Sequence, residues 1–132
     1  MPQSARFITP SEAHDSRGTL RFVQAAQQLP FVPMRAFWIT DVPAGAMRGG
    51  HAHTSCQEAL FVLRGSFTLD ITTRQHEQLS FTMEAGKEGV LIDAGEWCVL
   101  RNFSADVLVL VLASEEYKPA GYVHDYDTFL RL

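Results

Sequence analysis

Residues 66–72, Ser-Phe-Thr-Leu-Asp-Ile-Thr, and residues 78–83, Gln-Leu-Ser-Phe-Thr-Met, alternate polar and apolar side chains throughout. A period of two sends successive side chains to opposite faces of a sheet, so each stretch predicts a strand with one buried and one solvated face. The neighbouring sequence contains more short apolar runs of strand length. We expect further strands at residues 20–23, 35–41, 59–63, 89–92, 97–101 and 106–112.

Turn signals separate these runs. They are Pro43-Ala44-Gly45, Arg64-Gly65-Ser66, Glu84-Ala85-Gly86 and Asp93-Ala94-Gly95. Helix is expected only as a turn or two at residues 11–14 and 127–132. Many short strands at nearly regular spacing predict an all-β sandwich or small barrel. No internal repeat or linker interrupts the pattern, so we expect one domain over residues 1–132.

Composition narrows the classes of function. The chain has 132 residues, 46% hydrophobic and 20% charged, with a formal net charge of -4, which argues against a basic surface for nucleic acid. No apolar run approaches the roughly 18 residues of a membrane helix, and the N-terminus lacks the pattern of a signal peptide. The two cysteines, Cys56 and Cys98, fit neither a disulfide scaffold nor a zinc finger. We therefore expect a cytoplasmic domain without membrane or nucleic-acid partners.

The candidate chemistry lies in Arg48-Gly49-Gly50-His51-Ala52-His53. On a strand, residues two apart share a face, so His51 and His53 should lie side by side. Gln57 has the same parity, whereas alternation sends Glu58 to the opposite face. Imidazole is both a common metal ligand and a common general base near neutral pH. Two surface histidines on an edge strand would give the same pattern.

The spacing around this stretch resembles the two motifs of the cupin superfamily. Gly45, His51, His53, Glu58 and Gly65 fit G-x5-H-x-H-x4-E-x6-G, and Asp93, Gly95, Cys98 and Asn102 occupy the frame P-x-G-x2-H-x3-N. The resemblance implies an all-β cupin-type double-stranded β-helix, or jelly-roll barrel, with little helix. Because Cys98 stands where the last metal histidine is usual, the metal site is incomplete and no metal is predicted.

A closer resemblance covers Asp15 to Leu130. The block R-G-x-H-A-H at residues 48–53, followed by L-A-S-x2-Y at residues 112–117 and D-Y-D at residues 125–127, is similar to the nucleotide-sugar 3,4-ketoisomerases, the WxcM-like cupins. The resemblance implies a metal-independent cytoplasmic homodimer, without a cofactor, whose N-terminal strands exchange between subunits. It implies the substrate dTDP-4-keto-6-deoxyglucose, whose carbonyl moves from C4 to C3 for deoxyamino sugars of surface polysaccharides.

The resemblance also assigns roles to individual residues. It implies that His51 is the main base and that His53 relays or supplies a proton. The residues expected to bind the substrate are Arg17, Arg35, Arg48, Gln57 and Trp97, with the arginines facing the diphosphate because guanidinium groups match phosphate oxygens. Core packing is an equal alternative for Trp97. The tyrosines of the C-terminal segment are expected to pack that segment.

One departure from the family pattern keeps other functions open. Phe37 stands where family members commonly carry tyrosine, which removes a hydroxyl group that could contact the substrate. A binding module that holds a nucleotide sugar without converting it is therefore one alternative. The other is a metal-dependent cupin enzyme using His51, His53, Glu58 or Gln57, and Cys98.

Overall fold

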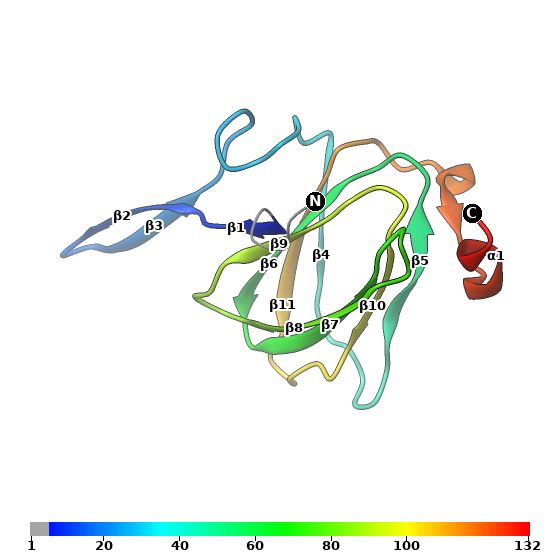
Figure 1. Cartoon of the computed structure of the whole chain (residues 1–132). Coiled ribbons are helices and arrows are strands. Elements are labelled where there is room, and N and C mark those ends of the chain that lie inside the picture. The colour runs from blue at the N-terminus through cyan, green and yellow to red at the C-terminus, as the bar shows by residue number, and fades with distance from the viewer. Residues whose placement is uncertain (1–5) are drawn as a thin grey trace.

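Two five-stranded antiparallel sheets pack face to face in the computed structural model, which describes residues 6–132 (Figure 1). The first sheet has the order β1 (Phe7–Ile8), β9 (Gly89–Ile92), β6 (Glu58–Arg64), β11 (Leu108–Ala113) and β4 (Arg35–Ile39). The second has the order β12 (Tyr122–Val123), β5 (Arg48–His53), β10 (Trp97–Arg101), β7 (Ser66–Thr72) and β8 (Gln78–Glu84). Consecutive strands often belong to different sheets, and the result is the expected cupin-type jelly-roll barrel.

The core lies between the two sheets and follows the alternation of the sequence. Phe67, Leu69 and Ile71 on β7 are at most 1% exposed, and they meet Leu60 and Val111 from the opposite sheet. Burial of each such side chain stabilises the fold by roughly 1.5–3 kcal/mol. The polar residues between them on β7 face the outside of the barrel.

Most predicted strands are confirmed. Those at residues 66–72, 89–92 and 97–101 have the predicted bounds, and the other five differ by at most two residues at either end. The C-terminal turn is also confirmed as α1 (Tyr126–Leu130), where the Asp125 carboxylate accepts a hydrogen bond from the Thr128 backbone N–H as an N-cap.

The helical turn expected at residues 11–14 is wrong. These residues belong to β2 (Ser11–Asp15), which pairs with β3 (Gly18–Phe22) in a separate hairpin. Cross-strand contacts such as Arg21 Nε to Glu12 Oε1 at 2.8 Å hold them extended, and no local pattern shows such contacts. β1 and β12 were not expected, because two-residue strands are too short to show a period.

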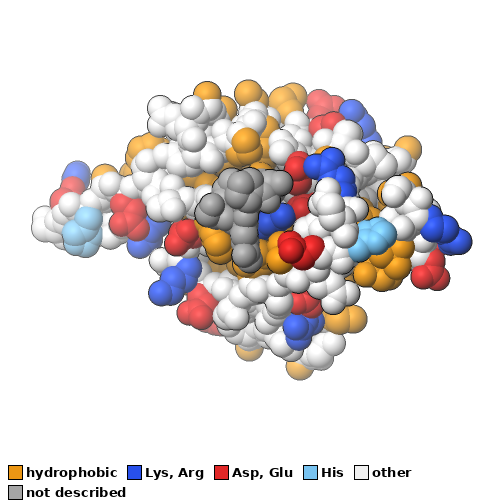
Figure 2. Space-filling model, in the orientation of Figure 1, with side chains coloured by type: hydrophobic (Ala, Val, Ile, Leu, Met, Phe, Trp, Pro, Cys, Tyr) orange, Lys and Arg blue, Asp and Glu red, His pale blue; other side chains and the backbone are white. Residues whose placement is uncertain are grey.

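The β2–β3 hairpin projects away from the barrel (Figure 1). Leu20 and Phe22 on β3 are 61% and 42% exposed. Acidic and basic side chains are interspersed over the face shown in Figure 2, with no broad basic area on it. Within residues 6–132, no helix combines the length and apolar character needed to cross a bilayer.

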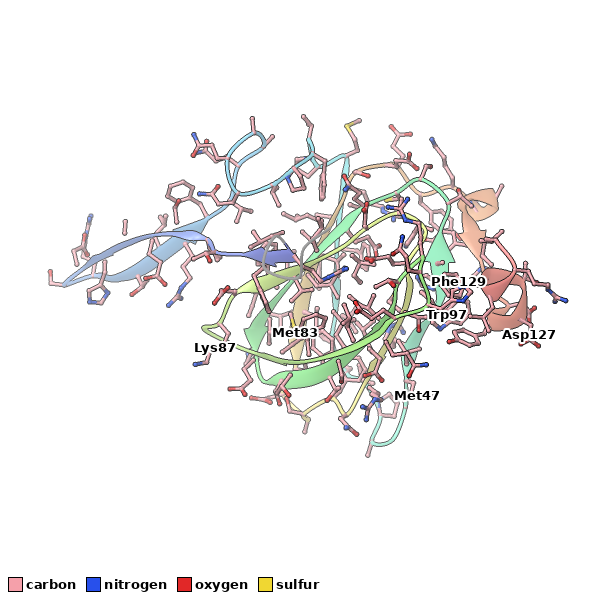
Figure 3. All side chains as sticks on the ribbon, in the orientation of Figure 1. Met47, Met83, Lys87, Trp97, Asp127 and Phe129 are labelled. Carbon is pink, nitrogen blue, oxygen red and sulfur yellow. The ribbon has the colours of Figure 1, made fainter. Side chains whose placement is uncertain are left out.

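Two contacts outside the main core hold Arg6 and α1 against the barrel. Arg6 and Glu96, 2% and 5% exposed, form a two-pronged ion pair with N–O distances of 2.6 and 2.8 Å. This pair ties the residue before β1 to the turn between β9 and β10. At the other end, Phe129 of α1 packs against Trp97 and Ala52 on the outer face of the second sheet (Figure 3).

Candidate active site

A β-bulge in β5 determines which side chains enter the barrel. In the pairing of β5 with β10, His51 faces Cys98 and Gly49 faces Val99, so Gly50 is an extra residue. Gly49 and Gly50 have φ values of +81° and +73°, which only glycine adopts at low cost. Because the bulge shifts the alternation by one residue, Arg48 and His51, three positions apart, both face the interior.

The interior of the barrel contains a cavity of about 160 Å³ against these residues. Its walls come from both sheets, and the lining residues are Phe37, Ile39, Arg48, Gly49, His51, Glu58, Leu60, Ile92, Cys98, Leu100, Val111 and Tyr122. Complete ligand pockets usually measure about 300–1,000 Å³. The cavity therefore suits a part of a ligand, such as one sugar ring.

His51 and His53 lie together as the sequence predicts. Their ring centroids are 5.1 Å apart, and the planes are nearly perpendicular. His53 is 3% exposed, whereas His51 is half-buried. Burial lowers the pKa of His51, and the neighbouring His53 lowers it further. Because a general base must be unprotonated, this environment keeps His51 ready to accept a proton at neutral pH.

Glu58 faces the histidines, contrary to the alternation argument. Its Oε1 lies 3.3 Å from His53 Nε2. The expectation fails because β5 ends at His53 and Glu58 begins β6 in the opposite sheet, so the period of two does not continue through residues 54–57. The expectation that Gln57 shares the face of the histidines is wrong for the same reason. Its side-chain amide instead donates to Asp93 Oδ1 at 3.0 Å.

Arg35 lies beside Glu58 because of the strand register. Ala113 on β11 is the partner of both residues, and its small side chain leaves room between them. The Nη2 atom of Arg35 is 3.9 Å from Glu58 Oε2. Its guanidinium also lies over the rings of Phe37 and Tyr117, at 5.3 and 5.6 Å from their centroids. These contacts hold the guanidinium beside Glu58 and Phe37, which line the cavity.

The C-terminal segment contributes aromatic side chains that the sequence assigned to packing. β12 pairs with β5, and its register places Tyr122 opposite His53. The Tyr122 ring centroid is 4.9 Å from that of His51 and 4.5 Å from that of His53. His124, not singled out before, stacks on Tyr122 at 5.5 Å. The alternation Tyr122-Val123-His124 resembles His51-Ala52-His53 and is the signal that could have identified this short strand.

The other two predicted substrate-binding residues, Arg17 and Trp97, lie elsewhere in the structure. Arg17, with its side chain 88% exposed, is at the tip of the β2–β3 hairpin and pairs with Asp15 at 2.6 Å. Trp97 faces away from His51, because its partner on β5 is Ala52. It lines an open hollow of about 550 Å³ on the outer face of the second sheet and packs near Tyr126 and Phe129. Neither residue lines the cavity.

The donor set does not fit a metal ion. In the part of the chain that the structure describes, no three His, Cys, Asp or Glu side chains are arranged to hold one. Cys98 lines the cavity, but burial raises the pKa of its thiol well above the usual range, and metal binding needs the thiolate. The metal-dependent alternative therefore lacks a coordination site among these residues.

Comparisons with known proteins agree with this geometry. Residues 3–132 match the family described as FdtA: WxcM-like, C-terminal. A TDP-4-oxo-6-deoxy-alpha-D-glucose-3,4-oxoisomerase from Aneurinibacillus thermoaerophilus is 30% identical over 115 residues, which cover 87% of this chain and 82% of that protein. The structure is similar to that of a 3,4-ketoisomerase from Helicobacter canadensis, with a TM-score of 0.89, 30% identity and coverage of 96% of this chain and 94% of the other.

A further similar structure contains a substrate. It is a mutant 3,4-ketoisomerase from Thermoanaerobacterium thermosaccharolyticum in complex with TDP-4-keto-6-deoxyglucose, with a TM-score of 0.88 and 26% identity, covering 95% of this chain and 90% of the other. The match along nearly the whole chain and the paired histidines in a cupin barrel lead to one conclusion. This chain belongs to the WxcM-like family of nucleotide-sugar 3,4-ketoisomerases.

Proposed function

We propose that this protein converts TDP-4-keto-6-deoxyglucose, the dTDP-linked sugar expected from the sequence, into the 3-keto isomer. The observation that carries the proposal is His51, a half-buried imidazole with a lowered pKa that lines a cavity of sugar-ring size and lies next to buried His53. The relatives named for this reaction support the choice of substrate.

The chemistry needs a base and an acid that exchange protons with neighbouring carbons. The C4 carbonyl acidifies the proton on C3, and His51 removes that proton. The C–H electron pair forms a C3=C4 double bond, and the carbonyl oxygen takes a proton supplied through His53, which gives an enediol. Loss of the proton from the C3 hydroxyl and protonation of C4 then leave a carbonyl at C3 and a hydroxyl at C4, so atoms and electrons balance.

Arg48 is placed to connect the sugar site with the nucleotide. It lines the cavity, yet its side chain is exposed to solvent. In the proposed complex the sugar ring lies inside the barrel and the diphosphate lies at the mouth, within reach of the Arg48 guanidinium. Arg35 is proposed to contact the sugar end of the substrate and not the diphosphate, because its guanidinium lies 3.9 Å from Glu58, which lines the cavity.

We further propose that the protein is a homodimer whose β2–β3 hairpins exchange between subunits. The hairpin exposes Leu20 and Phe22 and projects from its own barrel (Figure 1). A groove of about 160 Å³ next to it is lined by apolar side chains that include Phe61 and Leu110. In such a dimer, Arg17 at the hairpin tip would be carried toward the partner subunit, which gives it the substrate-binding role predicted from the sequence. The product would serve C3 amination in deoxyamino sugar biosynthesis, with the enzyme in the cytoplasm.

One observation favours the alternative of a binding protein without turnover. Phe37 lines the cavity and offers no hydroxyl group to the substrate. If that hydroxyl is needed for proton transfer, the chain would bind the nucleotide sugar and leave it unchanged. Phe37→Tyr would then introduce isomerase activity, whereas in an active enzyme it would only alter the rate.

Proton NMR in D2O distinguishes these functions. The purified protein is incubated with TDP-4-keto-6-deoxyglucose, beside a His51→Asn variant of the same concentration. New 3-keto signals with deuterium on the ring carbons, absent with the variant, support the proposal and give the C4 configuration of the product. Unchanged spectra, together with nucleotide binding by calorimetry, would support the binding protein instead. Light scattering of the same samples tests the homodimer.

A further inference from the structure

Glu58 is a buried carboxylate that the reaction described above does not use. It is 5% exposed, and its two oxygens lie near His53 Nε2 at 3.3 Å and Arg35 Nη2 at 3.9 Å. Within residues 6–132, His53 Nε2 has no hydrogen-bond partner, and neither has Arg35 Nε. Glu58, which lines the cavity, therefore lies between an imidazole and a guanidinium that are close to it but only loosely bonded.

Such an arrangement is a poor way to stabilise a fold. Burial of a carboxylate costs several kcal/mol, and the cost is recovered only with excellent geometry and full hydrogen bonding. The Arg6–Glu96 pair of the same protein has that geometry, at 2.6 and 2.8 Å. Glu58 does not, so its position is better explained by an interaction that strengthens when His53 becomes positively charged.

The ionisable groups around the histidines make the two imidazoles unequal. His51 and His53 are both on β5. The two strands that flank β5 carry Cys98 and Tyr122, and His124 stacks on Tyr122. Glu58 is the one acidic side chain among the residues that line the cavity. It contacts His53 directly. Burial and the neighbouring imidazole lower the pKa of His51, and the more distant charge of Glu58 opposes that lowering only in part. Paired titratable groups in opposed environments divide into an acid and a base.

We propose that Glu58 is a positioning residue that turns the Nε2 proton of His53 toward its carboxylate and stabilises the imidazolium form of His53. Arg35 lies on the other side of the carboxylate, with its Nη2 3.9 Å from Glu58 Oε2. With Nε2–H directed at Glu58, the proton on Nδ1 is the one that His53 can transfer, so His53 is the acid and His51 the base. This inference rests on the proposed isomerase function.

The test compares Glu58→Gln, which keeps the shape and removes the charge, with Glu58→Asp and with Glu96→Gln as a matched buried carboxylate outside the cavity. The rate kcat of Glu58→Gln should fall about 10- to 100-fold with KM nearly unchanged, as for other partners that orient a histidine. Glu58→Asp should recover part of the rate, and Glu96→Gln should keep it. Thermal unfolding of each variant shows that the protein is folded.

A second readout does not depend on turnover. Nitrogen-15 NMR of labelled histidines, with dTDP bound, reports the protonation of each ring nitrogen across the pH range. In Glu58→Gln the pH at which His53 takes up its second proton should fall, while Glu96→Gln should leave it unchanged. An unchanged His53 titration with an unchanged kcat would overturn the proposal. If the wild-type chain lacks isomerase activity, the proposed function fails, and the titration alone decides the role of Glu58.

Discussion

The bulge at Gly49 and Gly50 offers the sharpest test of how the site is built. Both glycines have a positive φ, but their surroundings differ. A Cβ on Gly49 would lie 2.8 Å from the Cys98 backbone oxygen and 3.3 Å from Leu100 Cδ1, whereas a Cβ on Gly50 would meet nothing within 4 Å. Alanine at the two positions therefore separates the cost of the left-handed backbone from the cost of the clash.

The magnitudes follow from these distances. An alanine in the left-handed region costs roughly 1–2 kcal/mol, and this is the whole expected effect of Gly50→Ala. Gly49→Ala adds a contact 0.6 Å shorter than the 3.4 Å at which ordinary contacts begin (3.4 minus 2.8). The atom it meets belongs to the backbone of the paired strand and cannot turn aside. Because overpacking typically costs about 1–3 kcal/mol, we expect Gly49→Ala to lower the free energy of unfolding by about 2–5 kcal/mol.

Urea denaturation of the two variants measures the difference. Gly86→Ala, at a φ of +81° with nothing within 4 Å of the added Cβ, is the control outside the cavity. Gly50→Ala and Gly86→Ala should lose similar amounts of stability, and Gly49→Ala should lose about 1–3 kcal/mol more. Equal losses in all three variants would refute the reasoning that close approach to β10 fixes the bulge.

Three further predictions concern single side chains. The acid limb of the kcat/KM pH profile should have its midpoint below 6.5, the ordinary pKa of imidazole, because the lowered pKa keeps His51 unprotonated to lower pH. A midpoint above 6.5 would contradict the role of His51 as the base. Glu96→Ala should lower the free energy of unfolding by about 3–5 kcal/mol, because it leaves the Arg6 guanidinium buried without its partner. Urea denaturation measures this change, and a loss below about 1 kcal/mol would contradict the explanation. Cys98 should resist DTNB at pH 8 in the native protein and react after unfolding, because it is buried and burial raises the pKa of its thiol. Rapid labelling of Cys98 in the native protein would contradict this prediction.

The sequence alone predicts the parts of the fold that depend on local periodicity. The strict alternation at residues 66–72 gives both the strand and its buried residues, and the four turn signals separate β4 from β5, β6 from β7, β8 from β9 and β9 from β10. The shared face of His51 and His53 follows from the same rule, because the bulge lies before His51 and the strand is regular from His51 to His53. The family resemblance adds the jelly-roll barrel and the class of reaction. Only the second strand of the hairpin at residues 11–22 was predicted. The first was missed because the two strands are stabilised by each other and neither has a buried face.

The contents of the cavity depend on where the chain changes sheets, which no local period encodes. Glu58 enters the site because the segment after His53 crosses the barrel, and the same crossing removes Gln57 from it. Arg48 joins His51 only through the extra residue in the bulge. Tyr122 reaches the histidines because a two-residue strand from the C-terminal segment pairs with β5. The period of the sequence thus determined which side chains of one strand share a face, whereas the pairing of distant strands decided which side chains come together in the cavity.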